Sequence, residues 1–145
     1  MAQKNIAQTK LLDYKVNVRI KLSSLWATLM ALYIYADYFQ LMTPGTIEGM
    51  QSLESPVGPI TPTLLVIFSV ILIIPALMIF LSLSLPPAFA KWLNILFALS
   101  YAAISVLIIV ADIGNAWQAS FVLYNFIELF VMITAFIMAL KWPRE

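Results

Sequence analysis

The sequence predicts an all-α fold, a four-helix transmembrane bundle, and three observations support this class. Four apolar stretches follow one another along the 145-residue chain, each close to the roughly 20 residues that cross about 30 Å of hydrocarbon. Proline, glycine or charged residues separate these stretches. The composition is 63% hydrophobic and 10% charged, with a mean hydropathy of +0.96, far from the balance of a soluble domain. We therefore expect one integral membrane domain over residues 1–145, with spans at 22–42, 63–85, 92–111 and 120–140.

The cations that precede the first span set the expected orientation. In the four-span arrangement all eight Lys and Arg residues fall on one side: before the first span, in the second connection and after the fourth span. The first and third connections carry none. Cytoplasmic loops hold an excess of Lys and Arg, so we expect a protein of the cytoplasmic (inner) membrane with both termini in the cytoplasm. The cations are Lys4, Lys10, Lys15, Arg19, Lys21, Lys91, Lys141 and Arg144.

The long first connection, residues 43–60, is the only sizeable segment expected outside the bilayer. Ile47, Met50 and Leu53 recur there at every third position, between flanking prolines. This spacing favours a short helix with one apolar face. We expect the helix to lie on the outer surface of the membrane.

Prolines mark both ends and the interior of the second span. Thr61 followed by Pro62 predicts a helix start, with the hydroxyl as N-cap and the proline in the first turn. Pro75 removes one helical hydrogen bond and predicts a bend. Pro86 and Pro87 predict the end of the helix and a short turn into the third span.

The third and fourth spans are expected to form a tight hairpin. Gly114 fits a helix C-cap, and Asn115 with Gln118 resembles a capping box that opens the fourth helix. Such a hairpin places Tyr101 level with Glu128 on the facing helix.

The four tryptophans are expected near the membrane–water interfaces, where amphipathic rings are enriched. Trp92 and Trp142 lie near inner ends of their spans, and Trp117 lies at an outer end. Trp26 is a further candidate for this belt, although it also falls on a stripe of the first span that is expected to point inward.

Glu128 is the acid expected deepest in the membrane. Thirteen residues at a rise of about 1.5 Å from Asn115 place it roughly 20 Å below the outer helix end. No Lys or Arg lies within a span at that depth, so an ionised carboxylate would have no protein cation beside it. We expect Glu128 to be uncharged unless a cation or a water-filled cavity reaches it. Tyr101 and Asn125 are its expected hydrogen-bond partners.

Polar residues in the first and third spans recur at helical spacing and are expected to face inward. With the fourth span they would line a cavity that opens outwards and is acidic at its mouth. The alternative is that the hydroxyls and amides form hydrogen bonds between helices, worth about 0.6 kcal/mol each. The candidate residues for binding a ligand, proton or cation are Glu128, Asp112, Asp37, Tyr101, Tyr33, Tyr124, Asn94, Ser105 and Asn125.

The composition excludes several classes of site. Cys and His are both absent, which removes disulfides, thiolate nucleophiles, haem-ligating histidine and the usual zinc ligands. A net charge of +1 without a basic stripe argues against a nucleic-acid partner. Phosphate-binding loops, dinucleotide fingerprints and nucleophile elbows are also missing from the sequence. We therefore assign no catalytic residue, no metal site and no cofactor.

Three runs carry a resemblance to a known family: residues 15–26 (KVNVRIKLSSLW), 33–39 (YIYADYF) and 44–49 (PGTIEG). Together they resemble a family of small prokaryotic integral membrane proteins described as a domain of unknown function with four predicted spans. The resemblance is strongest over residues 1–50, and the layout extends it to the full length. It implies a fold and a membrane location, and it brings no assigned residues. In layout alone the chain also resembles the DoxX-like four-span proteins, but the lack of histidine argues against redox-metal chemistry.

Three functions are compatible with this sequence. The first is binding or conduction of a small ligand, cation or proton through an outward-facing acidic cavity that ends at Glu128. The second is a non-catalytic accessory or structural subunit of a membrane complex. The third and weaker alternative is an intramembrane enzyme that modifies a lipid, with Glu128 or Asp112 as general acid; the absence of a second acid or base at that depth argues against it. The expected partners are the lipid bilayer, a small ligand or cation, and further copies or subunits.

Overall fold

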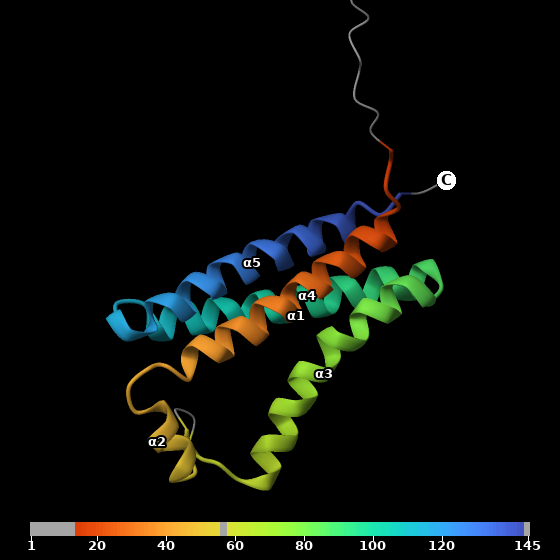
Figure 1. The fold of residues 1–145 in the computed structure, drawn as a ribbon. Helices are drawn as coiled ribbons and strands as arrows, with labels where there is room; N and C mark the ends of the chain where they lie inside the picture. Colours follow the sequence, from red (N-terminus) through yellow and green to blue (C-terminus); the bar gives the residue numbers. More distant parts are fainter. Residues whose placement is uncertain (1–13, 56–57, 144–145) are drawn as a thin grey trace, which may run out of the picture.

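The computed structural model describes residues 14–55 and 58–143 and consists of long helices joined by short connections (Figure 1). Lys4, Lys10 and Arg144, which entered the expected charge pattern, lie outside these residues. The all-α class is confirmed, since the two strands form only one short antiparallel pair. In chain order the elements are α1 (Val18–Gln40), α2 (Thr46–Gln51), β1 (Glu54–Ser55), β2 (Gly58–Pro59), α3 (Pro62–Ser84), α4 (Pro87–Asp112), the 3-10 turn η1 (Ala116–Gln118) and α5 (Ala119–Leu140).

Three helical segments are long and apolar enough to cross a membrane, namely Pro62–Ser84, Pro87–Asp112 and Ala116–Leu140. They correspond to the second, third and fourth expected spans, and they make the chain compatible with a membrane protein. The first expected span does not meet this criterion, although α1 is 23 residues long. Its serines, its tyrosines and Asp37 lower its mean hydropathy.

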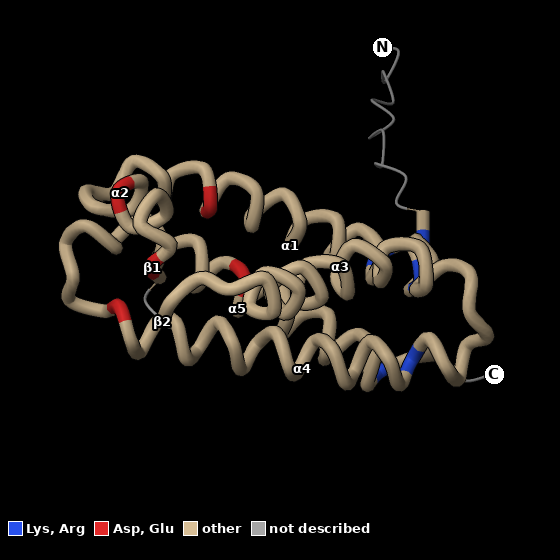
Figure 2. Tube along the Cα trace, turned by 90° about the horizontal axis from the view of Figure 1, so that it is seen from below, with Lys and Arg blue, Asp and Glu red and all other residues tan. Residues whose placement is uncertain are grey.

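Charged side chains are segregated along the molecule (Figure 2). The described Lys and Arg residues gather at the end where the chain enters α1 and leaves α5, which we call the basic end. The described Asp and Glu residues lie in the other half, which we call the acidic half. The basic residues are Lys15, Arg19, Lys21, Lys91 and Lys141, and the acidic residues are Asp37, Glu48, Glu54, Asp112 and Glu128.

Capping residues and prolines determine where the long helices begin. The Thr61 hydroxyl accepts a hydrogen bond from the backbone N–H of Leu64 at 3.1 Å, and Pro62 lies in the first turn of α3, as predicted. α4 begins at Pro87, earlier than expected, because a proline in the first turn loses only an N–H that would have no helical partner. α1 also begins earlier than expected, where the side chain of Asn17 caps it.

The connection between α4 and α5 is a tight turn. Gly114 adopts a positive φ of 95°, as a helix C-terminal glycine does. The capping box differs from the prediction, because the Asn115 side chain accepts from the N–H of Trp117 at 3.1 Å rather than from that of Gln118. The N–H of Gln118 instead donates to the carbonyl of Asn115, so the chain enters α5 through the 3-10 turn η1.

The first connection contains the expected short helix, α2. It begins after Gly45, whose φ is +84°, and ends before the short pair β1–β2. Residues from α2 and β1 lie over the ends of the long helices in the acidic half, where they contribute to a cavity described below.

α3 packs against the other helices along only one half of its length (Figure 1). Its buried residues, Pro75, Met78 and Ser82, all lie in its second half. There the hydroxyl of Ser23 in α1 donates to the carbonyl of Ile79 at 2.8 Å. The first half of α3 diverges from the other long helices, and Pro75 lies at the boundary between the two halves. This divergence leaves space in the acidic half of the molecule.

A buried hydrogen-bond network joins α1, α3 and α4. The indole N–H of Trp26 donates to Asn94 Oδ1 at 2.7 Å, and Asn94 Nδ2 donates to the hydroxyl of Ser82 at 3.1 Å. All three side chains are 0% exposed. Trp26 is therefore a core residue, which corrects its assignment to the interfacial belt, whereas Trp92 and Trp117 are exposed.

Candidate functional site

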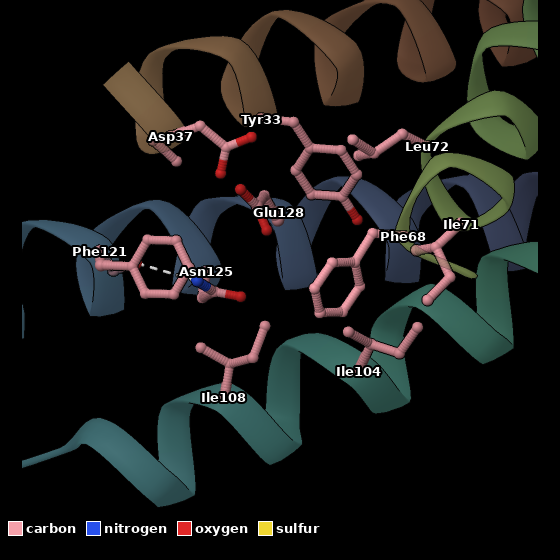
Figure 3. Close-up of a pocket in the computed structure, with 11 residues that line it drawn as sticks. Tyr33, Asp37, Phe68, Ile71, Leu72, Ile104, Ile108, Phe121, Asn125 and Glu128 are labelled. Carbon is pink, nitrogen blue, oxygen red and sulfur yellow. Dashed lines mark hydrogen bonds between the residues drawn. The ribbon is translucent and has the colours of Figure 1, made fainter. Parts of the chain in front are cut away.

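An inner cavity of about 500 Å³ lies where α3 diverges from the other long helices (Figure 3). Each of the four long helices contributes to its wall, which is mostly apolar, and the polar side chains come from α1 and α5. The lining residues are Tyr33, Ala36 and Asp37 of α1, Phe68, Ile71 and Leu72 of α3, Ile104 and Ile108 of α4, and Phe121, Asn125 and Glu128 of α5.

Two buried side chains of α5 present unpaired oxygens to the inner cavity. Glu128 is 2% exposed and its Oε1 has no hydrogen-bond partner in the described part of the chain. Asn125 is 1% exposed, and its Oδ1 is likewise without a partner. The amide orientation of Asn125 is fixed by chemistry, because its Nδ2 donates to the carbonyl of Phe121 at 3.0 Å and a carbonyl can only accept. Asn125 Oδ1 is therefore a hydrogen-bond acceptor, and Glu128 Oε1 is one when its carboxyl group is ionised.

Asp37 is the second acid that lines the inner cavity. Its side chain is exposed, unlike that of Glu128, and Figure 3 shows the two carboxyl groups pointing toward each other. None of the residues that line the cavity is Lys or Arg, and the described cations lie at the basic end (Figure 2). Two ionised carboxylates in this cavity would thus repel each other without a described cation between them.

The hydroxyl of Tyr101 does not bond to Glu128 as expected but donates to the backbone carbonyl of Ile71 in α3. In a regular helix that carbonyl accepts from the N–H four residues later, and that residue is Pro75, which has no N–H. Tyr101 therefore satisfies the carbonyl that Pro75 leaves free. Glu128 loses its expected partner for this reason.

A second, outer cavity of about 1070 Å³ adjoins the inner one in the acidic half. It is lined by α2, β1 and the neighbouring ends of the long helices, and it contains Glu54 and Asp112. The side chains that line both cavities are Phe68, Ile108 and Phe121, so the two cavities share this part of their walls.

The unpaired buried polar atoms of the described residues are concentrated in these two cavities. Gln40 Oε1 and Gln118 Oε1 face the outer cavity, and Asn125 Oδ1 and Glu128 Oε1 face the inner one. All of them are oxygens. Buried polar groups are normally hydrogen-bonded, so these four free oxygens are available to a hydrogen-bond donor that enters either cavity.

The structure brings together only part of the candidate set. Tyr33, Asp37, Asn125 and Glu128 line the inner cavity, and Asp112 lines the outer one. The remaining candidates line neither cavity and take part in packing. Asn94 belongs to the network with Trp26, and Tyr101 donates to the carbonyl of Ile71 and packs against the rings of Trp26 and Tyr33. Tyr124 stacks on Phe39, and Ser105 is buried in α4.

No sequence pattern indicated the part of the cavity wall that α3 forms. Phe68, Ile71 and Leu72 belong to an apolar run in which no residue stands out. Pro75 was the available signal, since it predicted an irregularity in the helix, but not which residues would face the space. Gln40 and Gln118 were also missed, because each lies at the end of a helix where an exposed amide is ordinary.

Comparison with known protein families matches residues 9–145 to a family of unknown function, DUF6326. The match includes every residue that lines the two cavities. No curated protein and no solved structure matches the chain. The resemblance to a domain of unknown function is confirmed, and the chain belongs to the family of unknown function DUF6326.

Proposed function

We propose that the chain is an integral protein of the cytoplasmic membrane in which all four long helices form a transmembrane bundle with both termini in the cytoplasm. α1 is 23 residues long, about 34 Å at helical rise, and it contacts both α3 and α5. Ser23 and Trp26 of α1 are buried against the other helices rather than exposed. The basic end then faces the cytoplasm, in keeping with the positive-inside rule.

Within this bundle, we propose that the inner cavity takes up a proton or a small cationic ligand at Glu128. The observation that carries the proposal is the unpaired Oε1 of this 2% exposed carboxyl, in an apolar cavity without a Lys or Arg among its lining residues. A carboxylate in such surroundings is unfavourable unless it is protonated or paired. A proton or a bound cation supplies the missing charge.

The outer cavity supports a route to Glu128 from the acidic half. Glu54 and Asp112 line the outer cavity, and Asp37 lies beside the inner one. Acidic groups at the mouth of a cleft raise the local concentration of cations. A proton or cation would enter past Glu54 and Asp112, pass the shared residues Phe68 and Ile108, and reach the buried carboxyl.

Carbodiimide labelling tests this proposal, because hydrophobic carbodiimides react with protonated carboxyls in apolar sites. We expect an adduct at Glu128, located by peptide mass spectrometry. Glu128→Gln should remove this adduct. Glu48→Gln is the matched control, because Glu48 lies on α2 and lines neither cavity. In this variant the carbodiimide should modify Glu128 as it does in the wild type. An unmodified Glu128 in the wild type would refute the proposal.

Flux in reconstituted vesicles is the second readout. If the site carries protons or cations across the membrane, a pH-sensitive dye inside the vesicles should report an ion-dependent flux in the wild type and in Glu48→Gln. The flux should be lost in Glu128→Gln. Equal flux in all three proteins would remove Glu128 from the mechanism.

A second candidate function, an accessory subunit of a larger membrane complex, is favoured by the exposed first half of α3. No residue of α3 before Pro75 is buried, so this half has an apolar surface that lipid or another protein would cover. Extraction in mild detergent followed by native mass spectrometry distinguishes the two functions. A foreign subunit at fixed stoichiometry favours the accessory role, whereas the chain alone or in self-oligomers does not.

A further inference from the structure

We infer that the ligand of the inner cavity is an amphipathic organic cation, with an apolar body and a protonated primary or secondary amine. This inference rests on the proposed function, since it places the positive group at Glu128. It adds the chemical class of the ligand, which the size, the walls and the free polar atoms of the cavity together define.

The first argument is the kind of polar atom that the cavity offers. The unpaired buried atoms that face it, Glu128 Oε1 and Asn125 Oδ1, accept hydrogen bonds, and Asn125 cannot turn its amide because its Nδ2 is held by the carbonyl of Phe121. A complementary ligand must therefore bring hydrogen-bond donors. A primary or secondary ammonium group supplies at least two donors and a positive charge, whereas a quaternary ammonium supplies the charge without any donor.

The second argument is the charge of the cavity. Asp37 and Glu128 both line it, with their carboxyl groups pointing toward each other, and the described cations lie at the distant basic end. One ammonium group between the two carboxyls interacts favourably with both. An anionic ligand would add repulsion, and a neutral ligand would leave the acids uncompensated.

The third argument is the apolar wall and the volume of the inner cavity. Phe68, Ile71 and Ile104 face the polar side chains across the cavity, and aromatic rings of Tyr33 and Phe121 flank it. About 500 Å³ lies within the range of roughly 300–1,000 Å³ that is typical of sites for organic ligands. Apolar walls of this extent bind the body of an organic molecule, and aromatic faces attract its cationic end.

A bare inorganic cation matches the cavity less well. Calcium takes six to eight oxygen ligands, and magnesium requires about six in octahedral geometry. The described residues contain no group of three or more His, Cys, Asp or Glu side chains placed to hold a metal ion. Glu128, Asp37 and Asn125 offer few oxygens, and the rest of the wall is largely hydrocarbon.

The test is binding of a matched series of probes to the full chain in lipid nanodiscs, measured by calorimetry with empty nanodiscs as the control for partitioning. Phenethylamine has the proposed ammonium group, phenethyltrimethylammonium retains only the charge, and phenethyl alcohol is neutral. We expect saturable binding of phenethylamine and weaker binding of the other two. Glu128→Gln should weaken phenethylamine binding by at least about thirtyfold, as for loss of one partner in a buried charge pair.

Two further variants distinguish a loss of binding at the site from a general effect on folding. Asn125→Leu should weaken phenethylamine binding by about fivefold, because one hydrogen bond is lost. It should leave binding of phenethyltrimethylammonium unchanged, because that probe has no N–H to donate. Glu48→Gln should bind phenethylamine like the wild type, since Glu48 lines neither cavity.

The outcomes distinguish this inference from the proposed function. One outcome is that carbodiimide labels Glu128 but phenethylamine does not bind, and that the site instead binds sodium or potassium or exchanges only protons. The organic-cation inference is then wrong, and the proposed role of Glu128 stands. If phenethyl alcohol binds as tightly as phenethylamine, the inference is also wrong. If neither labelling nor cation binding depends on Glu128, both proposals fail.

Discussion

The hydroxyl of Tyr101 donates a hydrogen bond to the backbone carbonyl of Ile71, which is the carbonyl that Pro75 leaves without its helical donor. This contact joins α4 to α3 one turn before Pro75, the first buried residue of α3. Ile71 also lines the inner cavity. The bond therefore stabilises the irregular segment of α3 that forms part of the cavity wall.

Tyr101→Phe should lower the free energy of unfolding by about 1 kcal/mol, because the carbonyl of Ile71 loses its donor within the protein. Unfolding in mixed detergent micelles, followed by circular dichroism, measures this change. Tyr35→Phe is the matched control, since Tyr35 is 59% exposed and should change little. In a Pro75→Ala background the helix regains its N–H at position 75, so the effect of Tyr101→Phe should nearly vanish. Equal effects in both backgrounds would contradict the pairing.

Asn94→Leu should destabilise the protein by about 2 kcal/mol, because the indole N–H of Trp26 and the hydroxyl of Ser82 would remain buried without their shared partner. Trp26→Phe removes one of these unpaired groups. The double variant should therefore lose less free energy of unfolding than the sum of the losses in the two single variants. Chemical unfolding of all three proteins gives the comparison. Strictly additive losses would show that the network does not couple the two residues.

Gly114→Ala should lower the free energy of unfolding by about 1 kcal/mol, since a side chain at a φ of +95° is strained. Gly49→Ala is the contrasting variant. Gly49 lies inside α2, and a Cβ there would meet only Glu54 O at an ordinary distance of 3.5 Å. Thermal unfolding should therefore separate the two variants, and a similar loss in both would argue against the turn geometry.

Thiol labelling tests the proposed orientation, and the chain offers a clean background because it contains no cysteine. In intact cells a membrane-impermeant maleimide should label Glu48→Cys in the acidic half and leave Lys141→Cys at the basic end unlabelled. After permeabilisation both variants should react. The reverse pattern in intact cells would place the basic end outside and overturn the proposed topology.

The local sequence determined the helices and most of their ends. Thr61 with Pro62 defined the start of α3, and Gly114 defined the turn after α4, since capping acts within a few residues of the chain. Apolar runs of about 20 residues defined three candidate spans, since the hydropathy of one continuous segment is enough to indicate a span. The importance of Glu128 was also predicted from depth and from the missing cation, and the structure places this residue in a cavity with its Oε1 unpaired.

Only the tertiary structure decided which polar residues are satisfied and which are free. Asn94 and Glu128 are both buried on inward faces of their helices, and helical periodicity alone does not distinguish them. Asn94 meets Trp26 and Ser82 because α3 packs there, whereas Glu128 meets open space because α3 has diverged and Tyr101 is engaged with Ile71. A hydrogen-bond partner depends on how whole helices pack in space, and helical periodicity specifies only the face on which a side chain lies.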